Sequence, residues 1–188
     1  MKKFRWAILL VILASAAALA FVKPSRVFIP KLAGVSCPER TLCIDDPSRL
    51  TEARRLVTAA TRDIEIKLGK FERSPKFIFC SSQACLESFG FKKAAAQTLG
   101  KAGTVVGPRG WVDHYLKHEL IHQWQAQKIG GMRMLFAPEW IAEGMAYALS
   151  DDPRPTLSEP FQSYRIKFDT WYQQINDRDL VDAIKREL

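Results

Sequence analysis

The segment WVDHYLKHELIHQW, residues 111–124, contains all the histidines of this 188-residue chain, spaced four residues apart: His114, His118 and His122. At that spacing they lie on one stripe of a helix. A second stripe, roughly 200° around the helix, is apolar and consists of Val112, Leu116, Leu120 and Trp124. The pattern predicts a helix over residues 111–128 with one side packed in the core and the other side carrying imidazoles.

Residues 118–122 of this helix read H-E-L-I-H. Positions four apart lie about 40° apart around a helix and about 6 Å along it, so the imidazoles of His118 and His122 can bind one metal ion. Glu119 lies at the edge of the same face, within reach of a water on that ion but at a poor angle to be a ligand itself. His114 lies about 12 Å along the axis from His122, which is too far for the same ion. It is a neighbour of the site or an ordinary helix residue.

A catalytic zinc ion usually takes three protein ligands and leaves its fourth position to water. The next predicted helix, EWIAEGMAYALS after Pro138, offers Glu139 and Glu143. An acid in the first helical turn, such as Glu139, is expected simply because it complements the helix dipole. Glu143 lies deeper in the helix among apolar residues, where a carboxylate without a partner would be costly to bury. The sequence therefore predicts Glu143 as the third ligand of one zinc ion per chain.

HELIH, followed 21 residues later by a glutamate within WIAEGMA, resembles the gluzincin clan of zinc metallopeptidases. The resemblance covers residues 104–150. It implies that His118, His122 and Glu143 bind zinc. It also implies that Glu119 is the catalytic acid and base in peptide-bond hydrolysis by a zinc-activated water, on a zincin-like fold.

The chain departs from this family pattern at one position. Thermolysin-like members often place an Asp four residues after the ligand Glu to orient a ligand His, and this chain has Tyr147 there. Asp151 and Asp152 are the nearby substitutes. The resemblance also implies a substrate-binding edge strand at residues 104–107. The motif does not define the group that stabilises the oxyanion, for which the candidates are Tyr147, Tyr164, Tyr172 and His114.

The remaining sequence predicts a mixture of helices and short strands. The predicted elements are a helix over residues 48–68, a strand over 76–80, short helices over 82–89 and 179–188, and a short edge strand or exposed turn at 105–106. With 47% hydrophobic and 26% charged residues, the chain can bury one ordinary core. We therefore expect an α+β protein: a mainly helical, zincin-like domain over residues 48–188 with a small, partly antiparallel sheet.

The N-terminus has the features of an export signal. Three basic residues among the first five precede an uncharged, mostly apolar run over residues 6–22. Residues 1–22 are therefore a signal peptide, cleaved after Ala20, or a retained membrane anchor. The domain is expected to face the periplasm or the extracellular side, anchored through this segment or secreted. Residues 23–47 are expected to form a linker and a cysteine loop.

The four cysteines fit an oxidising compartment, and they are Cys37, Cys43, Cys80 and Cys85. We favour two local disulfides, which pair Cys37 with Cys43 and Cys80 with Cys85. A zinc site made from all four cysteines is the alternative, but its usual spacing is shorter than the spacing found here.

The net charge of +8 comes from scattered basic residues rather than from a run. That scatter, without interleaved aromatic residues, argues against a nucleic-acid partner and favours a negatively charged membrane surface. The expected partner at the site is a peptide or protein substrate, and the oligomeric state is not indicated. The alternative function is a non-catalytic, membrane-tethered zinc-binding or interaction module with a zincin fold, which would not need Glu119.

Overall fold

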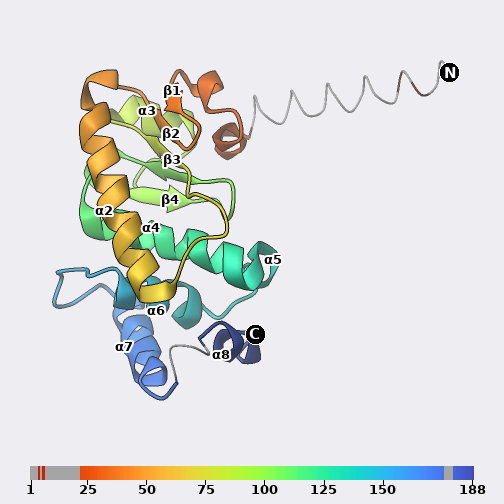
Figure 1. The fold of residues 1–188 in the computed structure, drawn as a ribbon, viewed down its shortest axis with the longest axis vertical. Helices are drawn as coiled ribbons and strands as arrows, with labels where there is room; N and C mark the ends of the chain where they lie inside the picture. Colours follow the sequence, from red (N-terminus) through yellow and green to blue (C-terminus); the bar gives the residue numbers. More distant parts are fainter. Residues whose placement is uncertain (1–3, 5, 7–21, 176–179) are drawn as a thin grey trace.

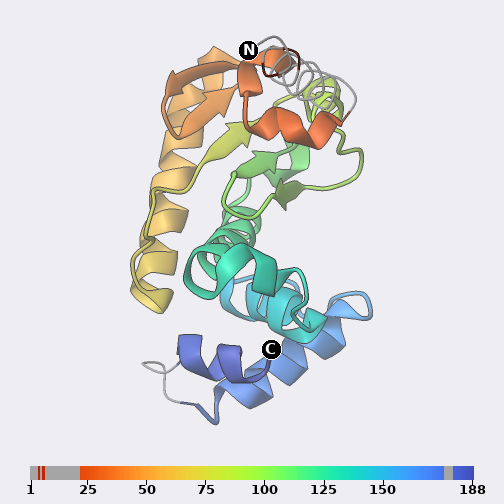
Figure 2. The same cartoon turned by 90° about the vertical axis from the view of Figure 1, so that its right-hand side faces the viewer.

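The structure is a computed structural model that describes Phe4, Trp6 and residues 22–175 and 180–188. The signal or anchor segment predicted for residues 1–22 lies almost wholly outside these described residues. Within them, no helix combines the length and the apolar composition that crossing a bilayer requires. Figures 1 and 2 show an elongated molecule with a small sheet at one end and mainly helices at the other.

Among the described residues, short strands form one mixed sheet. They are β1 (Ser36–Glu39), β2 (Leu42–Ile44), β3 (Phe77–Phe79), β4 (Ala96–Thr98) and β5 (Thr104–Val106). The order across the sheet is β1-β2-β3-β5-β4. The two outer pairs are antiparallel, whereas β2, β3 and β5 run parallel to one another. The class is therefore α+β with a small, partly antiparallel sheet, as the sequence predicts.

The edge strands of the sheet are β1 and β4, so the prediction of an edge strand at residues 104–107 is wrong. β5 lies between β3 and β4, and all its residues are buried. In β4, by contrast, Gln97 is exposed. The apolar Val105 and Val106 gain more from burial between two strands than at an edge, which explains the order.

Residues 23–47, predicted as a linker and a cysteine loop, contain short elements of regular structure, and the Cys37–Cys43 disulfide closes the loop. They form the 3₁₀ turns η1 (Lys23–Val27) and η2 (Pro30–Ala33), and then β1 and β2. Leu42 and Ile44 of β2 are buried in the main core and pair with β3. Because these apolar side chains complete the core, the domain begins well before residue 48.

Both predicted disulfides are confirmed. Cys37 pairs with Cys43 across β1 and β2, and Cys80 pairs with Cys85. No cysteine is left free. The alternative of a zinc site made from four cysteines is therefore wrong, and the disulfides fit an exported protein.

The predicted helices are found with small shifts at their ends. They are α2 (Leu50–Leu68), α3 (Gln83–Ser88), α4 (Asp113–Gln125), α6 (Glu139–Leu149) and α8 (Leu180–Arg186). Two further helices, α5 (Gly131–Met134) and α7 (Phe161–Tyr172), were not predicted from the sequence. The 3₁₀ turns η3 (Pro47–Arg49) and η4 (Pro108–Gly110) precede α2 and α4. A π-helical turn, η5 (Ala126–Gly130), continues α4.

Helix α4 crosses the middle of the molecule, between the sheet end and α6 (Figure 1). It packs against α2 and against α6. Leu116, Leu120 and Ile121 are fully buried. Val112, which the apolar stripe includes, is 44% exposed because the helix begins only after it. α4 is therefore enclosed on more than one side, and its imidazole stripe faces α6.

Helices α6 and α7 pack unusually close to each other at Gly144. A Cβ atom on Gly144 would lie 2.5 Å from the carbonyl oxygen of Tyr164. That contact would be far shorter than van der Waals distance, so the close packing requires a glycine. Gly144 directly follows the predicted ligand Glu143, so the same packing positions that residue.

Candidate metal centre

The predicted ligands converge between two helices. His118 and His122 lie on α4, and Glu143 lies on α6. The Nε2 atoms of His118 and His122 are 3.1 Å apart. Each Nε2 atom is also 3.4 Å from one oxygen of the Glu143 carboxylate. One ligand atom from each of the three residues can be chosen so that all lie within 4.8 Å of one another, as a shared metal ion requires.

The other candidate ligands lie outside this group. Glu139 is exposed at the start of α6 and lines the same cavity. His114 also lines the cavity, and its ring contacts that of Tyr115. In the described ranges, the only group of three or more His, Cys, Asp and Glu side chains with metal-binding spacing is His118, His122 and Glu143.

Lys117, next to His118, fixes α4 to its surroundings. Its ammonium group is 2.9 Å from Asp63 of α2, 2.6 Å from Asp113 of α4 and 3.0 Å from Asp151 after α6. Lys117 is only 5% exposed, and burial disfavours its charge, but the three carboxylates outweigh burial and raise its pKa. This brace joins α2, α4 and the end of α6, and so holds together the two helices that carry the candidate ligands.

His118, His122 and Glu143 are called the ligand group below. Glu119 lies beside the ligand group without belonging to it. The residue is 7% exposed and lines the cavity. Its Oε2 atom is buried and has no hydrogen-bond partner among the described residues. Its backbone carbonyl accepts a hydrogen bond from Thr98 Oγ1 at 3.1 Å, which ties α4 to the edge strand β4. A buried carboxylate oxygen that lacks a partner is costly unless a ligand or water contacts it.

The charges in this group support one another. Burial disfavours the charged form of His122, but the hydrogen bond to Glu143 and the nearby charges of Glu119 and Glu143 raise the pKa of His122 to about 9. Burial also disfavours the charge on Glu143, yet the hydrogen bonds from the two histidines hold its pKa well below the usual range. In the metal-free protein, the charges of His122 and Glu143 therefore stabilise each other.

The ligand group opens into a cavity of about 470 Å³. One wall is the β4 side of the sheet, at residues 94–97, and the other walls carry polar and aromatic side chains from α4, α6 and the following turn. Those side chains include Tyr115, Tyr147, Asp152 and Arg154, and Phe161 at the start of α7 also lines the cavity. The cavity thus combines an exposed strand edge with charged groups.

Of the predicted oxyanion candidates, two lie at the cavity and two do not. Tyr147 and His114 line it, and the ring of Tyr147 is 4.5 Å from that of His118. Tyr164 and Tyr172 are not among its lining residues; Tyr172 stacks on Phe168. Burial raises the pKa of Tyr147, so its hydroxyl keeps its proton at neutral pH.

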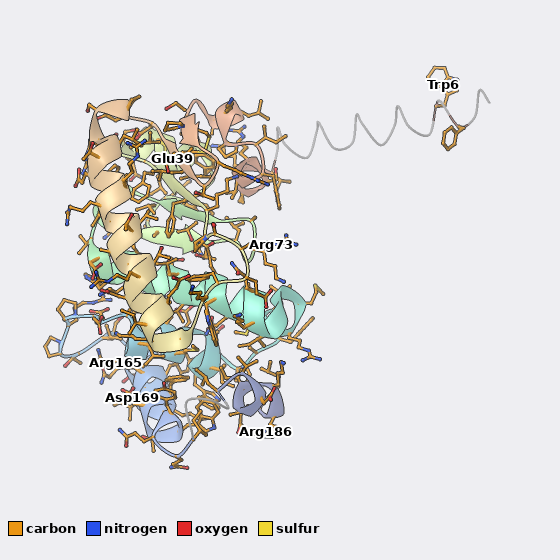
Figure 3. The ribbon with its side chains drawn as sticks, in the orientation of Figure 1. Trp6, Glu39, Arg73, Arg165, Asp169 and Arg186 are labelled. Atoms are coloured by element: carbon orange, nitrogen blue, oxygen red, sulfur yellow. A yellow bond between two sulfur atoms is a disulfide. The ribbon has the colours of Figure 1, made fainter. Side chains whose placement is uncertain are left out.

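Neither Asp151 nor Asp152 takes the place of the missing carboxylate at position 147. Asp151 binds Lys117, and Asp152 forms an ion pair with Arg154. Arg165 of α7 (labelled in Figure 3) holds the turn that contains Arg154, because its guanidinium donates a hydrogen bond to the backbone carbonyl of Arg154 at 3.0 Å. This contact places the Asp152–Arg154 pair at the cavity, a feature that no local pattern in the sequence indicates.

A ligand histidine is instead contacted by Gln125, which the sequence reasoning missed. Gln125 Oε1 lies 3.0 Å from His122 Nδ1. The spacing of three residues, which puts two side chains on neighbouring positions of a helix, is the signal that would have found it.

A second cavity, of about 270 Å³, also borders His122 and Glu143. Its lining combines the end of β4 and Gln125 with apolar side chains that include Met134 and Leu135. His122 and Glu143 therefore line both cavities, and both cavities are bordered by β4.

The chain matches no known family profile, no characterised protein and no solved structure. The resemblance to gluzincins accordingly rests on the motif and on the geometry of the residues that carry it.

Proposed function

We propose that this protein is a zinc-dependent peptidase that acts outside the cytoplasm. The observation that carries the proposal is the convergence of His118, His122 and Glu143 around one point, with the buried, unpartnered Oε2 atom of Glu119 beside them. A site that only stored a metal ion would not need this second, buried carboxylate.

The ligand set favours zinc over other common divalent ions. Two imidazole nitrogens and one carboxylate suit zinc, whereas magnesium and calcium prefer oxygen ligands alone. Ligands about 2.0–2.1 Å from a tetrahedral ion are about 3.3 Å apart. The separations of 3.1 Å between the imidazole nitrogens and 3.4 Å from each to a carboxylate oxygen are close to that value.

The side chains have distinct chemical tasks in this proposal. A bound zinc ion would supply an acidified water and polarise the scissile carbonyl. Glu119 would accept one proton from the water that attacks the carbonyl carbon, and it would return that proton to the amine nitrogen as the C–N bond breaks. Tyr147, protonated and at the cavity wall, is the proposed donor of a hydrogen bond to the negative oxygen that develops.

The edge strand β4 fits a peptide substrate. Ala95 and Leu99 make backbone hydrogen bonds toward β5. Because such bonds alternate along an antiparallel pair, the backbone groups of Ala96 and Thr98 point to the free edge. An extended peptide can add there as a further strand and lie along both cavities, past the ligand group.

The location in this proposal follows from two features. The disulfides require an oxidising compartment, and the apolar N-terminal run is the expected export segment. We propose a periplasmic or extracellular domain that is either anchored through that run or secreted.

Metal analysis and peptide turnover together test the proposal. The purified chain should bind about one zinc ion and cleave members of a mixed peptide library. Glu119→Gln keeps the three ligands, so it should retain zinc and lose at least about 10²- to 10⁴-fold in hydrolysis. Glu139→Gln is the matched control and should keep both properties. A zinc-loaded chain that cleaves no peptide would support the metal-binding module instead, and full activity of Glu119→Gln would contradict the proposed role of Glu119.

A further inference from the structure

We propose that Gln125 is a positioning residue of the metal centre, which sets the tautomer of His122 and links its ring to the helix that carries Glu143. The inference rests on the metal-binding part of the proposed function, and it concerns residues of this chain alone.

Gln125 is 1% exposed, and both ends of its amide have partners. Its Nε2 atom donates to the backbone carbonyls of Ile141, at 3.2 Å, and Ala142, at 3.1 Å. Its Oε1 atom is 3.0 Å from His122 Nδ1. The amide therefore bridges α4 and α6 at the residues that immediately precede Glu143.

The partners determine which way the amide points. Backbone carbonyl oxygens accept hydrogen bonds and cannot donate them, so the NH₂ group of Gln125 must face Ile141 and Ala142. The Oε1 atom then faces His122, and because an amide oxygen is only an acceptor, His122 Nδ1 must carry the hydrogen. A flipped amide would set oxygen against two carbonyl oxygens and lose these bonds.

This arrangement prepares His122 for a metal ion. A neutral imidazole carries a hydrogen on one nitrogen only, so a hydrogen on Nδ1 leaves the lone pair on Nε2. Nε2 is the atom that faces His118 and Glu143. Partners of this kind orient a ligand ring and raise its basicity, and replacing them typically costs about 10- to 100-fold in metal affinity.

The chain offers a matched control two residues away. Gln127 is 8% exposed, and its amide also makes two hydrogen bonds to backbone. Its Oε1 atom accepts from the backbone N–H of Arg73 at 3.0 Å, and its Nε2 atom donates to the backbone carbonyl of Arg73 at 3.1 Å. These bonds do not involve the ligand group. Gln127→Met therefore removes a buried amide of the same kind without touching His122.

Zinc affinity and thermal stability of the full chain, measured side by side, separate positioning from ordinary packing. Gln125→Met removes both ends of the bridge, so zinc affinity in chelator competition should fall by about 10- to 100-fold along with stability. Gln125→Glu keeps an acceptor for His122 Nδ1 but loses the donors to α6, so its stability should fall while its affinity stays closer to wild type. Gln127→Met should lose stability and keep wild-type affinity.

The tautomer gives a second readout that needs no metal. Because the chain has three histidines, ¹⁵N–¹H spectra can resolve each ring. At a pH where His122 is neutral, wild type and Gln127→Met should show the hydrogen on Nδ1, and Gln125→Met should show a mixture of tautomers.

Different results would overturn different proposals. A wild-type chain that binds no zinc would overturn the proposed function, whereas the tautomer spectra would still test Gln125. If wild type binds zinc and Gln125→Met binds it equally tightly, or if Gln127→Met loses as much affinity as Gln125→Met, the role of Gln125 is wrong. A wild-type His122 with its hydrogen on Nε2 would overturn it as well.

Discussion

The Nε2 atoms of His118 and His122 lie 3.1 Å apart, closer than two such rings would stay if both were protonated. One helical turn separates the two residues along the chain, and the carboxylate of Glu143 faces both nitrogens. Two imidazoles held this close share either a proton or a cation, so the geometry ties the behaviour of the site to metal and to pH.

Replacing Glu143 and Glu139 in turn should show which of these two glutamates of α6 binds the metal ion. Glu143→Ala removes a ligand, so zinc affinity should fall by more than the roughly 100-fold that loss of an outer partner costs, and added zinc should restore activity only in part. Chelator competition measures this. Glu139→Ala is the control and should cost only a helix-terminus effect of about 0.3–1 kcal/mol. Loss of zinc by Glu139→Ala, with Glu143→Ala unaffected, would reverse the assignment.

Zinc binding should strengthen as pH rises from 7 to 9. The pKa of His122 in the metal-free protein is raised to about 9, so at pH 7 its ring carries a proton that zinc must displace. Apparent affinity should therefore rise by about tenfold per pH unit and level off above that pKa. The pKa of Glu143 is lowered, so this carboxylate adds no pH dependence in that range.

Competition with a chelator of known pH dependence gives the affinity, and proton release in weak buffer gives the stoichiometry. His114→Gln should leave the slope unchanged, because His114 lies outside the ligand group. A flat profile between pH 7 and 9 would mean that His122 is already neutral.

Lys117→Met should destabilise the fold, because three carboxylates lose the cation they share. Since Lys117 is buried but the carboxylates are partly exposed, we expect a loss of about 1–3 kcal/mol in urea unfolding at pH 7. Partial desolvation opposes the charge of Asp151, but its contacts with Lys67 and Lys117 lower its pKa, so its contribution to stability is present above its unfolded pKa.

That contribution is lost as pH falls through the folded pKa of Asp151. The pKa of Lys117 is raised, so its charge persists throughout the acid range. The difference between wild type and Lys117→Met should therefore shrink toward pH 3. Lys128→Met, which removes a longer ion pair at 3.8 Å with Glu72, should change stability by less than about 0.5 kcal/mol. Equal effects of the two variants would argue against the brace.

Gly144→Ala should push α7 away from α6. The added Cβ would lie 2.5 Å from the backbone oxygen of Tyr164, which cannot move alone, so we expect a loss of about 1–3 kcal/mol in the free energy of unfolding and weaker zinc binding. Gly131→Ala has no atom within 4 Å of the new Cβ and should be near neutral. Thermal unfolding and chelator competition measure both variants, and a Gly144→Ala protein of wild-type stability would show that the helices separate without cost.

The sequence by itself determined the parts of this protein that depend on short-range geometry. The helical period places His118 and His122 on one face, and an isolated carboxylate in an apolar helix marks Glu143 as their partner. The disulfides were likewise predictable, because each closes a loop of a few residues. The same reasoning extends to the long, periodic helix α2, whose apolar face is plain in the sequence.

Only the tertiary structure decided which distant segments meet. The strand order places β4 at an edge of the sheet and β5 between two strands. The pairing of β2 with β3 places β2 in the core, although its residues lie in the segment predicted as a linker and cysteine loop. Helix packing places Tyr147 at the cavity, whereas Tyr172 stacks on Phe168 away from it. The same packing brings the amide of Gln125 into contact with α6. Such contacts depend on how all the apolar faces are buried together, a property of the whole chain that no local pattern contains.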